Sequence, residues 1–355
     1  MTFFEELKWR GLVKDISSPD LEEKLNNESL TFYWGTDPTA DSLHLGHYSS
    51  LVTAKRLMLH GHKPILLVGG ATGLIGDPRP TAEREIISKE TVEKNIEGLK
   101  RQVTRLLDNK AEVVNNYDWT KNVTFLDFLR DIGKYINVNY MLNKDIISRR
   151  LESGITYAEF SYTLLQGFDF LHLFKNKNCT LQAAGSDQWG NITTGIELIR
   201  KIEGVEAYGF TMPLILDKTG KKFGKSEGNA LWLDKEKTSP YLIYQYLLNS
   251  DDSKVIEYLK VFTFLNKEEI DALEEKVKTE PEKREAQKTL AYEVVKDLHG
   301  VEEAEKAKKT SEEVFTKGYS SEGMPSETIE YKDNMNLMDI LVMTKITTSK
   351  SEARR

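Results

Sequence analysis

The sequence contains very little of what a secreted, disulfide-bonded or membrane-spanning protein needs. Its 355 residues include a single cysteine, Cys179, which excludes an internal disulfide and a cysteine-rich zinc site. No apolar run approaches the roughly 20 residues that span a bilayer. The N-terminal residues carry early acids and lack the basic-then-apolar order of a signal peptide. These absences predict a protein of the reducing cytoplasm that does not enter a membrane.

Basic residues are also fewer than acidic ones. Lysine and arginine number 49 and aspartate and glutamate 56, which gives a formal net charge of -7. Proteins that coat nucleic acid without specificity need an excess of positive charge, so that function is disfavoured. A local basic surface for one folded RNA stays open. The length allows two or more domains, each with its own core.

The first two-thirds of the chain predict an α/β domain with a parallel sheet. Residues 30–35 are typical of a strand, residues 45–60 of a helix, and residues 63–70 of a strand buried on both faces, which together make a βαβ unit. The pattern returns as a strand at 179–185, a helix at 191–201 and a strand at 210–216, which Pro213 makes less regular. Residues 123–174 are predicted to form a mainly helical insertion.

After residue 228 only helices are predicted. Ser239 and Pro240 form a strong helix start, as N-cap and first helical residue. A stretch rich in glycine, serine and glutamate begins at Gly318 and is typical of a linker. We therefore divide the chain into a Rossmann-like domain (1–228), a helical domain (229–317) and a C-terminal segment (318–355).

Two histidines stand three residues apart where a polar turn enters the first predicted helix. The residues are His44-Leu45-Gly46-His47, here called the histidine motif. Free backbone N–H groups and the helix dipole make such a helix start an anion site, and Gly46 lets a ligand approach the backbone. Ordinary helix-start histidines and a metal pair are the alternatives. No third ligand cluster lies nearby, so no metal site is predicted.

A second cationic element follows the last predicted strand. Residues 219–226 (TGKKFGKS), here called the lysine loop, interleave glycines with three lysines. A lysine run is usually a solvated loop, but phosphate binding is favoured in a chain that already offers an anion-binding helix start. The order of glycine and lysine differs from that of the Walker loop, GxxxxGK[ST].

The two motifs, in this order on an α/β domain, resemble the signature pair of the class I aminoacyl-tRNA synthetases. Pantothenate and nucleotidyl transferases share the first motif and are the main competing families. Residues 33–47, 76–78, 115–119, 162–169 and 185–191 narrow the resemblance, because they are similar to motifs of bacterial tyrosyl-tRNA synthetases. The resemblance runs to about residue 316 and more weakly to the end.

This resemblance implies a tyrosine–tRNA ligase. Such an enzyme uses ATP, as its Mg²⁺ complex, to convert L-tyrosine to tyrosyl-adenylate and pyrophosphate, and then transfers the tyrosyl group to the 3′-terminal ribose of tRNA(Tyr). The phenolic hydroxyl of tyrosine would be bound by Tyr33 and Asp169. Its α-ammonium would be bound by Asp77, Tyr162 and Gln166, with Asn116 and Gln182 in support.

The resemblance assigns the remaining site residues to ATP and tRNA. Contacts to the ribose, adenine or adenylate would come from Gly35, Asp37, Gly46, Gly185, Asp187, Gln188, Leu214 and Ser226. The phosphates would be bound by Thr39, His44, His47, Lys222 and Lys225, and Arg84 would reach the pyrophosphate or the tRNA end. Contacts to tRNA would come from Lys144, Arg200 and Lys201.

Physical reasoning agrees with the assigned tyrosine pocket. Tyr162, Gln166 and Asp169 fall on one helical stripe by their spacing. A carboxylate beside a tyrosine hydroxyl accepts the phenolic proton of tyrosine, which phenylalanine cannot offer. A site built for a hydroxyl therefore rejects phenylalanine, an effect for which tyrosyl-tRNA synthetases are themselves the standard example.

The resemblance further implies a symmetric homodimer, built near residues 128–141, that binds one tRNA across both subunits. The sequence itself offers an apolar helical face there, Phe125, Phe128, Leu129 and Ile132, which a monomer core would equally explain. Relatives end in an S4-like RNA-binding domain, of which residues 338–355 look like the opening only. The chain is therefore expected to activate tyrosine normally and to charge tRNA poorly.

Two other functions remain as alternatives. A tryptophanyl-tRNA synthetase would share the motifs but lack the pairing of Tyr33 with Asp169. A noncatalytic RNA-binding paralogue would be free to lose His44, His47 or Lys225, all of which this chain keeps. Trp34 departs from the family, which commonly has cysteine there.

Overall fold

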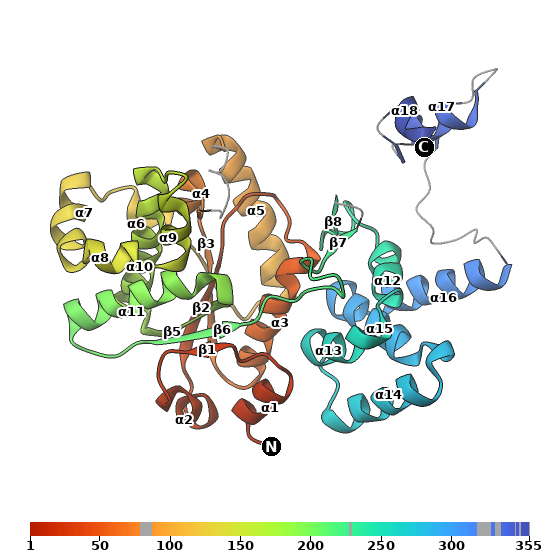
Figure 1. Cartoon of the computed structure of the whole chain (residues 1–355), viewed down its shortest axis with the longest axis horizontal. Helices are drawn as coiled ribbons and strands as arrows, with labels where there is room; N and C mark the ends of the chain where they lie inside the picture. The colour runs from red at the N-terminus through yellow and green to blue at the C-terminus, as the bar shows by residue number, and fades with distance from the viewer. Residues whose placement is uncertain are drawn as a thin grey trace.

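A computed structural model describes residues 1–78, 87–226, 229–317, 328–330, 335–344, 346–347 and 349–354. A six-stranded sheet lies at the centre of the N-terminal part, in the order β1-β6-β5-β2-β3-β4 (Figure 1). Its strands are β1 (Asp15–Ile16), β2 (Thr31–Thr36), β3 (Lys63–Val68), β4 (Glu112–Asn115), β5 (Cys179–Gly185) and β6 (Tyr208–Met212). Every pair is parallel except β1 with β6, so the predicted α/β fold is confirmed.

The predicted strands and helices differ from the observed ones mainly at the edges of the sheet. Strand β6 ends at Met212, so the strand predicted to 216 was too long; Pro213 follows and has no N–H to donate to a ladder. Edge strands β1 and β4 were not predicted, because each is short and only partly buried. The helix predicted at 45–60 is α3 (Leu45–Leu59), and the one at 191–201 is α11 (Trp189–Glu203).

Helices cover both faces of the sheet. Helices α3 and α5 (Lys89–Leu106) pack on one face, and α10 (Tyr157–Lys177) and α11 pack on the other (Figure 1). Successive side chains of a strand point to opposite faces, so Phe32 and Trp34 of β2 enter the first core and Tyr33 enters the second. The remaining helices of this part are α1 (Phe3–Trp9), α2 (Asp20–Asn27), α4 (Thr72–Ile75), α6 (Tyr117–Thr120), α7 (Phe125–Asp131), α8 (Val138–Leu142) and α9 (Asp145–Leu151).

The second part of the chain consists of helices, as predicted. They are α12 (Pro240–Leu248), α13 (Asp252–Phe262), α14 (Lys267–Thr279), α15 (Glu285–His299) and α16 (Val301–Lys317). Ser239 caps α12 by accepting the N–H of Leu242, and Pro240 is its first residue. A short hairpin, β7 (Lys225–Ser226) with β8 (Asn229–Ala230), precedes them. Helices α17 (Leu337–Met343) and α18 (Lys350–Ala353) pack on each other. No described helix is both long and apolar enough to cross a membrane.

Buried polar contacts join α3 to the helical part. The Tyr48 hydroxyl and the Lys55 ammonium donate to the two oxygens of Asp297 on α15, each at 2.7 Å. The buried Arg56 guanidinium donates to the carbonyls of Val261 and Thr263 at the end of α13. Burial lowers the pKa of Arg56 to about 9. The helix that starts with the histidine motif is therefore held by the helical part along its length.

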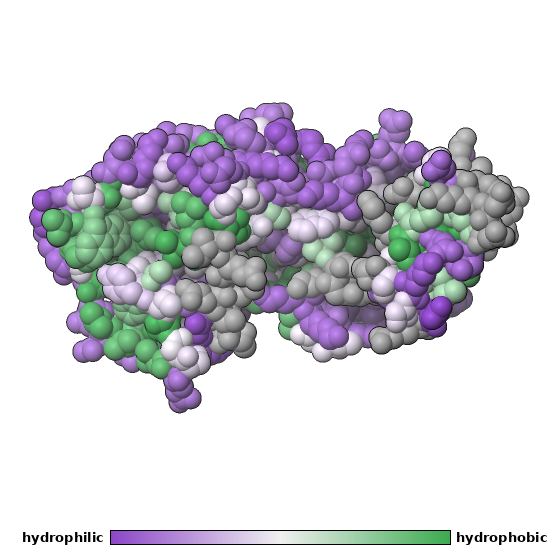
Figure 2. Space-filling model, turned by 90° about the horizontal axis from the view of Figure 1, so that it is seen from above, coloured by the Kyte–Doolittle hydropathy of each residue, from purple (hydrophilic) through white to green (hydrophobic). Residues whose placement is uncertain are grey.

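Several large apolar side chains remain exposed at the end of the molecule built by α7–α9 and the start of α10 (Figure 2, left). They are Phe125, Leu126, Leu129, Val138, Leu151 and Tyr157, and together they form what we call the apolar face. Phe128 and Ile132, which the sequence placed on the same helix face, pack instead in the core beneath α10.

Candidate active site

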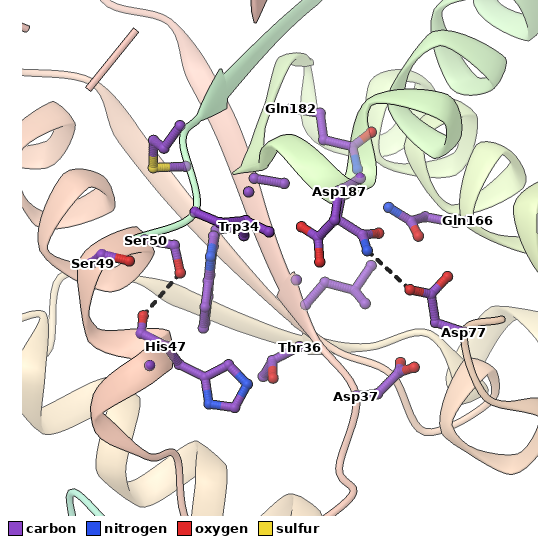
Figure 3. A pocket seen from close by; sticks show the side chains of 18 of the residues that line it. Trp34, Thr36, Asp37, His47, Ser49, Ser50, Asp77, Gln166, Gln182 and Asp187 are labelled. Carbon is purple, nitrogen blue, oxygen red and sulfur yellow. Dashed lines mark hydrogen bonds between the residues drawn. The ribbon is translucent and has the colours of Figure 1, made fainter. Parts of the chain in front are cut away.

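A cavity of about 550 Å³ opens at the carboxyl ends of β2 and β5, beside the start of α3 (Figure 3). The sheet order reverses between these two strands, and ligands of open parallel sheets bind at such a point. Its walls include most of the residues that the sequence assigned to tyrosine and ATP: Tyr33, Gly35, Asp37, Thr39, His44, Gly46, His47, Asp77, Tyr162, Gln166, Asp169, Gln182, Gly185, Asp187, Gln188, Leu214 and Lys222. Arg84 and the side chains of Lys225 and Ser226 lie outside the described residues.

The histidine motif caps its own helix. His44 is the N-cap of α3, and its Nδ1 accepts the N–H of Gly46 at 3.1 Å. The Nδ1 atom of His47 accepts the N–H of His44 at 3.4 Å, and the two rings stack with centroids 3.8 Å apart. Because Nδ1 accepts in both rings, a neutral ring carries its proton on Nε2. Nε2 is then the donor that can meet a phosphate oxygen.

The lysine loop is fastened to that helix start. Leu231, just after the loop, accepts the N–H of Leu45 at 2.7 Å and donates to the carbonyl of Gly224 at 3.1 Å. Phe223 is buried and stacks on Phe262 with centroids 4.7 Å apart. Lys222 is exposed at the rim of the cavity. The two motifs therefore meet at the cavity, and Lys222 lines it together with His44 and His47.

Tyr33 and Asp169 lie together at the inner end of the cavity. The Tyr33 hydroxyl is buried and makes no hydrogen bond of ordinary geometry with the described residues, although the Gln166 side chain interacts with it. Burial and the nearby Asp169 carboxylate raise the pKa of Tyr33 well above its usual range. Asp169 is 2% exposed, and burial raises its pKa to about 7 even though Asn116 and Trp119 each donate to it at 2.9 Å. A ligand hydroxyl placed here would meet a donor and an acceptor that have been removed from water.

Beyond Asp169, the cavity is lined by Asp37, Asp77 and Asp187 (Figure 3), of which the first two accept hydrogen bonds from neighbouring side chains. Asp37, at the end of β2, accepts the Tyr162 hydroxyl at 2.9 Å and the Thr72 hydroxyl at 2.7 Å. Asp77 accepts the side-chain amides of Gln188 at 3.0 Å and Asn191 at 3.3 Å. A cluster of carboxylates in a cavity of this size favours a ligand with a cationic group.

The residues assigned to tRNA lie apart from the cavity. Arg200 and Lys201 are on the outer surface of α11, where both pair with Glu197. Lys144 is buried, and its ammonium donates to Tyr140, Gly190 and Thr193. An ammonium whose three protons are all used inside the fold has none left for RNA, so this placement disfavours the predicted contact of Lys144 with tRNA.

Comparison with known proteins identifies the family. The model for class I tRNA synthetases (W and Y) matches residues 25–316. The chain belongs to this family. The tyrosine–tRNA ligase 1 of Bacillus subtilis is 50% identical over 99% of this chain and 87% of its own length. The tyrosine–tRNA ligase of Bacillus pumilus is 51% identical with the same coverage. These identities place the synthetase in the tyrosine–tRNA ligase group and exclude the competing transferase families.

Solved structures agree with this grouping. A C-terminally truncated mitochondrial tyrosyl-tRNA synthetase of Aspergillus nidulans is 32% identical, with a TM-score of 0.79, and the match covers 88% of this synthetase and 94% of that chain. A tryptophanyl-tRNA synthetase from Encephalitozoon cuniculi matches with a TM-score of 0.62 at 15% identity, over 86% of this chain and 87% of its own, which shows a common fold.

Sequence reasoning missed several residues that shape the site of this synthetase. Trp119 binds Asp169 and Thr72 binds Asp37, although Trp119 lies in a stretch that carried the family resemblance. Ser49 and Ser50 line the cavity beside His47 (Figure 3), as does Trp34, which the sequence marked only as a departure from the family. The helical period of α3 could have revealed Ser50, because it lies one turn after the histidine motif; Thr72 carries no comparable local signal.

Proposed function

We propose that this synthetase activates L-tyrosine with ATP and transfers it to tRNA(Tyr). The observation that carries the proposal is the pairing of Tyr33 and Asp169 at the closed end of the cavity. Tyrosine is the amino acid whose side chain fills such an end and supplies a hydroxyl for both groups. The indole of tryptophan carries only a donor, so it would leave the Tyr33 hydroxyl without an acceptor.

The rest of the cavity supports an amino acid that lies along it. With its phenol at Asp169, the α-ammonium of tyrosine reaches the middle of the cavity, where Asp77, Tyr162 and Gln166 bind it. Asn116 supports the far end through its bond to Asp169, and Gln182 is buried in the wall beside it. The carboxylate of tyrosine then points toward the carboxyl ends of β2 and β5, where Gly35, Asp37, Gly185, Asp187, Gln188 and Leu214 form the wall for the nucleotide.

Activation is a displacement at the α-phosphorus of ATP. The tyrosine carboxylate is already a nucleophile, so the step needs no general base: its oxygen bonds to the α-phosphorus while the bond to the bridging oxygen breaks and pyrophosphate leaves. Catalysis then consists of positioning and of stabilising phosphoryl charge. Thr39, His44, His47 and Lys222, which line the cavity, would supply donors and positive charge to the phosphates, and Arg84 and Lys225 would complete the phosphate-binding set assigned from sequence.

Magnesium enters with ATP in this proposal. Asp37, Asp77 and Asp187 line the cavity, but among the described residues no three side chains of metal-binding type form a cluster. Mg²⁺ bound by phosphates and water fits this donor set better than a cage made by the protein.

The second step and the assembly follow from the same family assignment. A hydroxyl of the terminal tRNA ribose attacks the carbonyl of the adenylate and AMP leaves. Arg200 and Lys201 offer a basic surface for the RNA. The apolar face supports a homodimer, since large exposed apolar patches usually mark interfaces. A cytoplasmic location belongs to the proposal, because the lone cysteine is buried and protein synthesis takes place there.

The deciding experiment is ATP–pyrophosphate exchange in the absence of tRNA. Exchange should depend on tyrosine, with phenylalanine and tryptophan supporting almost none. Asp169→Ala should abolish tyrosine-dependent exchange while the protein keeps its fold by circular dichroism. Exchange that prefers tryptophan, or that is unchanged in Asp169→Ala, would refute the proposed substrate site.

A further inference from the structure

A buried lysine joins the helical insertion to the turn at residues 188–191, which forms the start of α11. Lys144 occupies the position before the first residue of α9, and only 8% of its surface is exposed. Its ammonium donates to the carbonyl of Gly190 at 2.6 Å, to the hydroxyl of Tyr140 at 3.1 Å and to that of Thr193 at 3.2 Å. The three protons of the ammonium thus have three acceptors, which compensates for the burial of the charge.

The acceptor Gly190 lies between two residues that hold Asp77. The Gln188 amide donates to one oxygen of Asp77 and the Asn191 amide to the other. The Asn191 amide also donates to the Gln188 side-chain oxygen at 2.9 Å, so the two side chains are held to each other. Any shift of the backbone at Gly190 moves both donors, and therefore the carboxylate between them.

We infer that Lys144 is a positioning residue for tyrosine: it fixes the turn at residues 188–191 and, through Gln188 and Asn191, the orientation of the Asp77 carboxylate in the cavity. The inference rests on the proposed function, in which Asp77 binds the α-ammonium. Lys144 itself touches neither tyrosine nor ATP. A side chain that contacts the substrate is only as well oriented as the residues that hold it in place.

Two features distinguish this role from simple packing and from RNA binding. The Lys144 bond to the Gly190 carbonyl is the shortest of its three, and its Cδ lies 3.8 Å from where a Gly190 Cβ would stand, so the stem packs on the turn itself. Its side chain runs inward, whereas Arg200 and Lys201 lie on the outside of α11. The positioning role predicts a change in tyrosine binding in assays that contain no tRNA, whereas a contact with RNA predicts no change there.

The test uses exchange kinetics without tRNA on the full chain. Lys144→Met keeps the length of the stem and removes the ammonium, so the Gly190 carbonyl and the Tyr140 and Thr193 hydroxyls lose this donor. We expect the KM for tyrosine to rise about tenfold, with the KM for ATP unchanged and kcat changed by less than about threefold. Lys175→Met is the matched control, because Lys175 also bonds to α11 but does so through Glu203, at the end of that helix far from Gly190.

Thr193→Val provides a second variant that removes one acceptor of Lys144 and keeps the shape of the side chain. It should raise the tyrosine KM by a smaller factor in the same direction, which keeps the inference testable even if Lys144→Met does not fold. An unchanged tyrosine KM in both variants overturns the inference. So does a KM that rises only for tRNA in aminoacylation, which would assign Lys144 to RNA binding.

The controls separate this inference from the proposed function. If the unmodified protein shows no tyrosine-dependent exchange, the proposed function fails before any variant is compared. If the unmodified protein shows tyrosine-dependent exchange and Lys175→Met behaves like the unmodified protein, the comparison with Lys144→Met tests the Lys144 inference alone. Thermal unfolding of each variant tells whether a change in KM follows a loss of stability; a tyrosine KM that is restored in proportion to stability at lower temperature would likewise overturn the inference.

Discussion

Gly224 and Gly46 touch through their backbones: a Cβ atom added to Gly224 would lie 2.5 Å from the Gly46 nitrogen and 2.9 Å from the Leu45 carbonyl carbon. Gly224 also has a φ of +89°, a conformation that side chains disfavour. Its carbonyl and the N–H of Leu45 both bond to Leu231. The lysine loop and the histidine motif are far apart in the sequence, but their backbones are in contact. A residue with a Cβ atom at position 224 would collide with the start of α3, so this contact requires glycine.

Gly224→Ala should impair adenylate formation more than it impairs folding. The added methyl group must push the loop away from the start of α3, and a shift of about 1 Å in a phosphate-binding group can lower kcat by roughly a hundredfold. Stability should fall by about 1–3 kcal/mol from backbone strain. The kcat of pyrophosphate exchange and thermal unfolding measure the two effects.

Gly220→Ala is the matched control for this prediction. Gly220 lies in the same loop with a φ of +81°, but nothing stands within 4 Å of the position of its added Cβ. It should carry the backbone strain without the collision. If both substitutions lower kcat equally, the contact between the two glycines is not what matters.

The sequence predicted the framework of the fold because that framework is encoded locally. The strands at Thr31–Thr36 and Cys179–Gly185 and the start of α12 at Pro240 follow from apolar runs and capping residues. Strand β1 could not be found, because two residues at an edge, held by pairing with β6, leave no pattern.

The sequence predicted which residues form the site, but it did not predict the hydrogen bonds between them. Tyr162 and Asp169 share a stripe of α10, and that spacing is visible in the sequence. The bond from Tyr162 to Asp37, in contrast, depends on how α10 packs beside β2. Lys144 illustrates the same limit: the family resemblance assigned it to tRNA, and only the packing of its surroundings reveals that its charge is used inside the fold.

Asp297→Ala should loosen the contact between α3 and the helical part. It removes the acceptor of both Tyr48 and Lys55. The ion pair of Lys55 with Asp297 is mostly buried, because the Lys55 side chain is only 13% exposed and that of Asp297 15%. Loss of a partner that leaves a mostly buried charge costs about 2 kcal/mol after allowance for the remaining exposure. Chemical denaturation measures the loss. Asp271→Ala, which breaks the exposed pair with Lys267, should change stability by less than about 0.5 kcal/mol.

Leu126→Glu should separate the proposed homodimer. Leu126 is 76% exposed on the apolar face, so the monomer tolerates the charge, whereas a self-complementary interface would bury the carboxylate twice. Sedimentation should show the dimer converting to monomer. Val301→Glu changes an exposed residue of α16 in the same way, outside the apolar face, and should leave the assembly intact. A Leu126→Glu protein that sediments like the unmodified one would argue against an interface at this face.

Asp169→Asn should change how stability and tyrosine binding respond to pH. Burial raises the Asp169 pKa from its ordinary value of about 4 to about 7, so between these pH values the folded protein holds a proton that the unfolded chain has released. The free energy of unfolding therefore falls as pH rises from about 4 to about 7, by at most about 1.4 kcal/mol per pH unit for one group. Asn has no proton to lose there, and the variant should lack this part of the slope.

Tyrosine binding should change in the opposite direction, because the ionised carboxylate is the stronger acceptor for the phenol. The tyrosine KM of the unmodified protein should fall as pH rises from about 6 to about 8, while that of Asp169→Asn should be higher and nearly flat. Asp118→Asn removes a carboxyl group that is 69% exposed on the neighbouring helix α6 and should reproduce the unmodified profile. If Asp169→Asn keeps the same fall in KM across this range, the titrating group belongs to the substrates, and Asp169 does not control recognition of the phenol.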